Sequence, residues 1–135
     1  RKMLILSREM GLETEPDNID ILPILPEACL KAPDLDSFYN ELEQAEPYFA
    51  QMKNTAAAEG KKLRYIGVLE GDEIKIAPES VDSSHPFFGL EGSDNIIAFS
   101  TERYNQGPLV VKGPGAGPQV TAAGVYADII KIASA

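Results

Sequence analysis

The first part of the chain shows helical spacing of hydrophobic residues, followed by strand-like alternation. Residues 1–11 contain the apolar run Met3 to Leu6 and predict a helix, with Gly11 as its C-terminal stop. In residues 19–26 apolar residues alternate with aspartate or proline over part of the segment, which predicts a strand. Two prolines in that segment confine the strand to a sheet edge or end it early.

Two helices are predicted in the following third of the chain. Asp34 or Asp36 can cap the first of them, because a carboxylate accepts hydrogen bonds from the free amides at a helix start. The second carries Pro47 in its first turn, where proline is favoured, and ends at Gly60. An apolar stripe along the second helix indicates that one of its faces is buried.

Strands dominate the rest of the chain. Four apolar segments predict them: 63–69, 74–76, 96–101 and 109–111. The first two flank a short turn and form a hairpin. Strands clustered in this way, with helices before and after them, predict an α+β fold, in which a mostly antiparallel or mixed sheet carries helices on one face. Regular βαβ alternation is missing, so we expect no nucleotide fold within these residues.

A glycine-rich loop with the sequence G-P-G-A-G, residues 113–117, joins the last strand to a final helix over 118–134. The loop departs from both common phosphate-binding patterns: no Lys-Ser or Lys-Thr follows it, and Pro118 stands where the dinucleotide fingerprint needs its third glycine. Two interpretations stay open. The free amides at the helix start suit an anion, or the loop is a tight turn whose glycines supply positive φ angles.

The final helix is apolar on nearly every face, and Asp128 and Lys131 are its only charged residues. A helix that is apolar all round is expected to be buried all round. In a small α+β domain, one face of a closing helix should meet water. We therefore expect this helix to pack against something outside these 135 residues, such as another domain.

Charge and cysteine content exclude several classes of partner. The formal net charge is −9, which argues against nucleic acid or an anionic membrane surface. Apolar runs fall short of the roughly 20 residues that span a bilayer. Cys29 is the only cysteine, so an internal disulfide is impossible and a reducing cytoplasm is the simplest location.

Residue patterns alone single out few candidates for chemistry. Lys2 precedes the first apolar run and, judged without other information, is a solvated helix lysine. His85 is the only histidine and is expected to be a turn residue, and no metal site is predicted. Glu41, Glu43 and Glu46 are expected to form a solvated acidic face.

Residues 113–117, 120–125 and 128–130 read G-P-G-A-G, V-T-A-A-G-V and D-I-I. These segments match the patterns G-x-G-A-G, V-T-A-A-G-V and D-[IL]-[IL], and so the chain resembles the C-terminal part of the catalytic region of homoserine dehydrogenase. Its D-V-A-R-K segment is similar to Arg1-Lys2, which an apolar helix follows.

Weaker matches extend the resemblance over nearly the entire chain. Residues 85–87 and 95–99 resemble the family's P-F and E-N-x-[IL]-x-F stretch, with Asp94 in place of the common Glu. Residues 63–67 resemble the form of the enzyme that is fused to aspartate kinase.

The resemblance implies a function. Homoserine dehydrogenase interconverts aspartate semialdehyde and homoserine with NAD or NADP, on the way to threonine and methionine. Lys2 matches the catalytic lysine of the family, which can give a proton to the carbonyl oxygen and stabilise the alkoxide. Gly117 matches a backbone contact to the cofactor. For Lys2 the resemblance overrides the interpretation as a solvated lysine.

The same resemblance implies a domain organisation. Residues 1–112 would be part of the substrate and dimerisation domain, and 113–135 the glycine loop and a helix that returns to a nucleotide-binding domain outside this chain. We expect a homodimer or higher homo-oligomer. The uncapped start at Arg1 and the lack of an initiator Met suggest a piece of a longer protein. On this view the aspartate partner of Lys2 lies upstream, and the 135 residues alone are inactive. The alternative is a non-catalytic dimerisation or regulatory module of the same fold.

Overall fold

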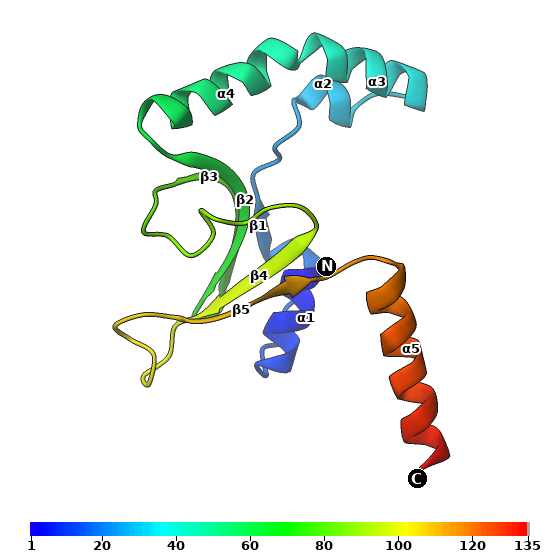
Figure 1. The fold of residues 1–135 in the computed structure, drawn as a ribbon. Coiled ribbons are helices and arrows are strands. Elements are labelled where there is room, and N and C mark those ends of the chain that lie inside the picture. The colour runs from blue at the N-terminus through cyan, green and yellow to red at the C-terminus, as the bar shows by residue number, and fades with distance from the viewer. Residues whose placement is uncertain (135) are drawn as a thin grey trace. The chain divides into compact units, whose positions relative to one another are not determined.

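The computed structural model describes residues 1–134, and the chain divides into two compact units. The first unit is Arg1–Asp82 and the second is Ser83–Ala135. Figure 1 shows the helices and strands of both units. The domain boundary expected at residue 112 differs from this division between the two units, because residue 112 lies within a strand of the second unit. That boundary stays a prediction.

Helix α1, Lys2–Glu9, confirms the helix predicted at the start. The chain leaves it through Gly11, whose φ of 88° is the left-handed conformation that favours glycine after a helix. A short 3-10 turn, η1 at Pro16–Asn18, then leads into strand β1, Ile19–Ile21. As the prolines predicted, β1 is short and lies at the edge of its sheet.

Three helices follow β1. They are α2, Glu27–Leu30, which the sequence did not reveal, then α3, Leu35–Gln44, and α4, Glu46–Ala58. Asp34 is the N-cap of α3, and its carboxylate accepts a hydrogen bond of 2.7 Å from the backbone amide of Ser37. That hydrogen bond holds the pKa of Asp34 below its ordinary value.

The first unit contains a three-stranded sheet in the order β1-β3-β2. Strands β2, Lys62–Glu70, and β3, Glu73–Val81, form the predicted hairpin and pair antiparallel along their full length. Strand β1 pairs parallel with the first part of β3. The sheet is therefore mixed, as expected.

Buried residues lie on both faces of this sheet. In the observed register Ile66 stands opposite Ala77, and Lys62 opposite Val81, so the buried Ile66, Ala77 and Val81 share one face. Ile74, only 2% exposed, lies on the other face together with Gly67. Helix α1 packs on that second face, where Met3 contacts Gly67.

The second unit consists of a hairpin and a helix. Strands β4, Asp94–Phe99, and β5, Leu109–Pro114, pair antiparallel in a sheet of their own. Helix α5, Pro118–Ala133, follows the glycine loop, as predicted. The strands are thus hydrogen-bonded into two small sheets, and the α+β class is confirmed.

Candidate functional site

Lys2, the predicted catalytic residue, is the first residue of α1 and is exposed. The N-cap position before it is Arg1, which makes no capping hydrogen bond through its side chain. The side chain of Lys2 therefore projects from a helix start. What matters for its chemistry is how firmly that helix is held.

Close packing fixes the first turn of α1 against the sheet. A Cβ atom placed on Gly67 would lie 2.7 Å from both Cγ and Sδ of Met3. Only a residue without a side chain admits Met3 this closely, which explains a glycine inside β2. One turn later, Ser7 is fully buried, and its hydroxyl donates a hydrogen bond of 2.9 Å to the carbonyl oxygen of Leu4.

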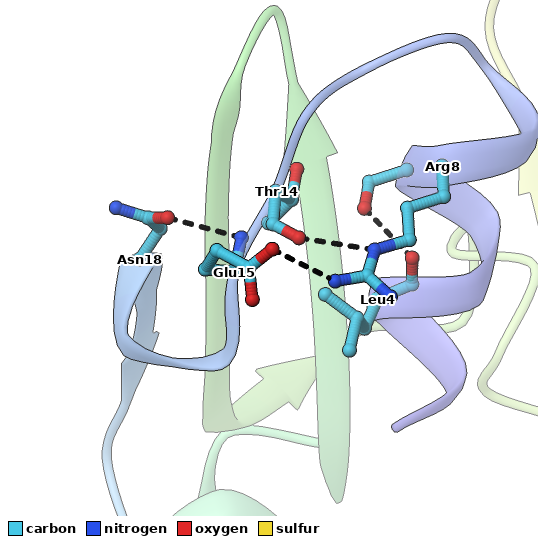
Figure 2. A network of polar contacts seen from close by, with 6 residues as sticks. Leu4, Arg8, Thr14, Glu15 and Asn18 are labelled. Atoms are coloured by element: carbon cyan, nitrogen blue, oxygen red, sulfur yellow. Dashed lines mark hydrogen bonds and ion pairs between the residues drawn. The ribbon is translucent and has the colours of Figure 1, made fainter.

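Arg8 ties the other end of α1 to the segment that enters β1, as Figure 2 shows. Its Nε donates to the carbonyl oxygen of Thr14 at 3.1 Å, and its guanidinium pairs with the Glu15 carboxylate at 3.1 Å. The backbone amide of Glu15 in turn donates to Oδ1 of Asn18 at 3.0 Å, which closes the η1 turn. Helix α1 is thus held at both ends, and Lys2 stands on a fixed support.

Gly117, the predicted cofactor contact, is the N-cap of α5. Its φ of 130° and ψ of 156° lie in a region that is essentially restricted to glycine. A Cβ atom on Gly117 would meet nothing within 4 Å. The backbone at Gly117 is therefore open to a ligand.

The start of α5 also offers backbone donors. The carbonyl oxygen of Gly117 accepts the first helical hydrogen bond, from the amide of Thr121 at 3.0 Å. No side chain caps the helix in the part of the chain that the structure describes. Pro118 has no N–H, so the donors at this end come from Gln119 and Val120 rather than from every residue of the first turn. The 16-residue helix adds the positive end of its dipole.

The two interpretations of the glycine loop are therefore compatible. Gly117 has the positive φ of a tight turn, and the helix that it opens has the donors of an anion site. Neighbouring strands support the loop at its other end, where the ammonium group of Lys112 lies 3.5 Å from the carboxylate of Asp94. The loop thus begins on a paired strand and ends on a helix start.

His85 has the structural role predicted for it. Its Nδ1 accepts a hydrogen bond of 3.1 Å from the amide of Phe87, and the two rings pack edge to face with centroids 4.9 Å apart. The carbonyl oxygen of His85 accepts from the amide of Phe88. Within residues 1–134, no group of three His, Cys, Asp or Glu side chains is arranged to hold a metal ion. Nor is any described helix long and apolar enough to cross a membrane.

Lys2 and Gly117 belong to different units, and each is positioned by contacts inside its own unit. Sequence reasoning missed the residues that do the positioning. Gly67 carried a usable signal, because a glycine inside an apolar strand often marks a close approach of another segment. Asn95, which contacts the glycine loop, stood out only as part of the E-N-x-[IL]-x-F match, and that match gave it no role.

The chain is similar to known proteins over both of its units. The family model described as homoserine dehydrogenase matches residues 1–130. A bifunctional aspartokinase/homoserine dehydrogenase of Zea mays is 41% identical over 138 residues, which cover 99% of this chain and 15% of that protein. A homoserine dehydrogenase of Saccharomyces cerevisiae is 40% identical over 136 residues, which cover 98% of this chain and 38% of that protein.

A solved structure supports the fold. A crystal structure of a protein of unknown function from Candida auris matches with a TM-score of 0.83 and 38% identity, over 98% of this chain and 38% of that one. The chain therefore spans only a minor part of the length of each of these proteins.

Proposed function

This chain belongs to the homoserine dehydrogenase family, and we propose that it is the part of such an enzyme that supplies the catalytic lysine and one wall of the cofactor site. The full-length protein would interconvert L-aspartate 4-semialdehyde and L-homoserine with NAD or NADP. The observation that carries the proposal is the family match over residues 1–130, which includes both Lys2 and Gly117.

Lys2 is the proposed proton donor. In the reducing direction a nicotinamide, when bound, would supply hydride to the carbonyl carbon. The ammonium group of Lys2 gives a proton to the carbonyl oxygen, and its charge stabilises the negative charge that develops there. In the oxidising direction the neutral amine takes the hydroxyl proton of homoserine. The exposure of Lys2 and the anchoring of α1 suit this role, because a proton donor must be both accessible and fixed.

Gly117 is the proposed backbone contact to the cofactor. Its conformation, and the open space where a side chain would stand, let a ligand come close to the main chain. The donors at the start of α5 suit the anionic groups of a dinucleotide. The residues present thus fit this cofactor class on geometric and electrostatic grounds.

Helix α5 is proposed to pack on a nucleotide-binding domain supplied by the rest of the protein. Apolar residues make up most of α5, yet all its residues are exposed, including Val125 and Ile129 at 58% and 56%. An exposed apolar helix is unfavourable in water, so we expect another domain to pack on it. Residues 113–135 would then belong with that domain, and residues 1–112 with a substrate and dimerisation domain of a homo-oligomer.

The parent is further proposed to be a cytoplasmic protein fused to aspartate kinase, like the bifunctional relatives. An aspartate kinase assay of the full-length protein tests the fusion, and cell fractionation tests the location. The plant relatives themselves are named chloroplastic.

The decisive experiment compares the full-length protein with the 135 residues alone. We expect the full-length protein to oxidise homoserine and to bind NADP(H), and residues 1–135 to do neither. Sedimentation of the full-length protein should show a dimer or larger assembly. A full-length protein without homoserine-dependent reduction of NAD or NADP would overturn the proposed activity, and turnover by residues 1–135 alone would overturn the division of the active site.

A further inference from the structure

Two of the three glycines of the loop 113–117 are glycine for different reasons, and neither reason applies to Gly113. Gly117 has a positive φ of 130°. Gly113 and Gly115 do not have positive φ angles, so φ does not require glycine at either position. Nothing lies within 4 Å of a Cβ atom on Gly113, whereas a Cβ atom on Gly115 would overlap the side chain of Asn95.

The overlap at Gly115 involves Asn95 first of all. The three heavy atoms nearest to such a Cβ are all from Asn95: its amide nitrogen, its Cγ at 2.5 Å and its Cβ at 3.3 Å. Asn95 lies on β4 directly opposite Gly113 of β5. Its side chain therefore reaches forward from the paired strands and occupies the space beside Gly115, where the chain has left the sheet.

This contact connects a strand to the loop. An asparagine side chain has only two rotatable bonds, so its amide group stays close to the strand that holds its backbone. The amide also has two donors and an acceptor, which suits it to lie against main chain. Next to it, the Lys112–Asp94 ion pair links the same two strands. The Asn95–Gly115 contact and this ion pair thus both lie at the end of the hairpin that leads to Gly117.

We propose that Asn95 is a positioning residue for the cofactor site: it holds the loop 113–117 through Gly115 and so places the backbone of Gly117 for its contact with the dinucleotide. Gly115 is glycine because Asn95 needs the space. The inference rests on the proposed function, since it assumes that Gly117 contacts NAD or NADP.

A double-mutant cycle in the full-length protein tests this inference. The variants are Asn95→Ala, Gly115→Ala and the double variant, with Gly107→Ala as the matched control, because a Cβ at Gly107 meets nothing within 4 Å. Each is titrated with NADPH, and steady-state kinetics give KM for homoserine and kcat at saturating cofactor.

Either single variant should weaken NADPH binding about tenfold, because each removes the Asn95 amide from its place beside the loop. The double variant should bind no more weakly than Asn95→Ala, because the amide group that would collide with the new methyl group is then gone and only the Cβ of residue 95, 3.3 Å away, remains. KM for homoserine should stay at the wild-type value. Gly107→Ala should bind NADPH like the wild type.

The possible failures are distinguishable. A wild-type protein that binds neither NADPH nor NADH would overturn the proposed function and this inference together. Normal binding by wild type and by all variants would overturn the inference alone. Additive losses in the double variant would show that Asn95 and Gly115 act separately. An increase in KM for homoserine as large as the change in NADPH affinity would reveal a general loss of structure instead of a placed loop.

Discussion

The two units differ in how they are supported. All the buried apolar side chains of residues 1–134 lie in the first unit, whereas no residue from 83 to 134 is buried. Lys2 therefore stands on a helix anchored to a core, and Gly117 stands in a unit without a core of its own. A proton donor needs a fixed position in its own domain, whereas a backbone contact to a ligand can be completed by the domain that holds the ligand. Variants of the two residues and of their neighbours can separate these two modes of support.

The largest effect is expected at Lys2. In the full-length protein, Lys2→Ala should lower kcat about 10²- to 10⁴-fold, the usual range for loss of a positioned proton donor. The dissociation constant of NADPH should change little. Steady-state kinetics and fluorescence titration measure both, and Lys53→Ala, an exposed lysine of α4, is the control. Wild-type kcat in Lys2→Ala would leave Lys2 a surface lysine and favour a non-catalytic module.

Gly117→Ala should show the opposite pattern. A side chain at φ 130° costs about 1–3 kcal/mol, so the backbone shifts and NADPH affinity should fall about tenfold or more. At saturating cofactor, kcat should recover most of the wild-type value. Gly107→Ala again serves as the control. A large loss of kcat with unchanged NADPH affinity would contradict the role given to Gly117.

Gly67→Ala tests the anchoring of α1. The added methyl group would push Met3 away from the sheet, which should destabilise the protein by about 1–3 kcal/mol. Combined with Met3→Ala, the loss should be smaller than the sum of the two single effects, because the collision is then removed. Thermal unfolding of the full-length variants measures this, with Gly89→Ala as the control. Strict additivity would show that Met3 and Gly67 are not coupled.

The smallest effect concerns the N-cap of α3. Because the hydrogen bond from Ser37 lowers the pKa of Asp34 in the folded state, its contribution to stability is present above the unfolded value and is lost as pH falls through the folded value. The protection factors of the α3 amides, which compare their exchange rates with the intrinsic rate at each pH, should therefore fall in acid in the wild type. In Asp34→Asn, which keeps a capping side chain without a titrating group, this acid response should shrink. An equal response in both proteins would place its origin elsewhere.

Local sequence signals accounted for most elements. Prolines and glycines marked the ends of β1, α1 and α4, and alternating apolar residues marked the hairpin. The later half of β3 was missed because Pro78 and the polar residues after it hide the strand pattern. Helix α2 was missed because four residues between prolines carry no helical period. The later half of β3 forms because it pairs with β2. Helix α2 forms in the segment that leads to α3.

The sequence by itself determined the class of fold, the family and the two residues to which we assign chemistry, because these depend on local patterns and on a long match of motifs. Tertiary structure decided what supports them. Met3 packs against Gly67 and Asn95 against Gly115, and in each case no local pattern identifies which segment the glycine contacts. The physical reason is that a glycine required by its own φ angle can be inferred from its turn, whereas a glycine required by a neighbour's side chain is explained only when that neighbour is in place.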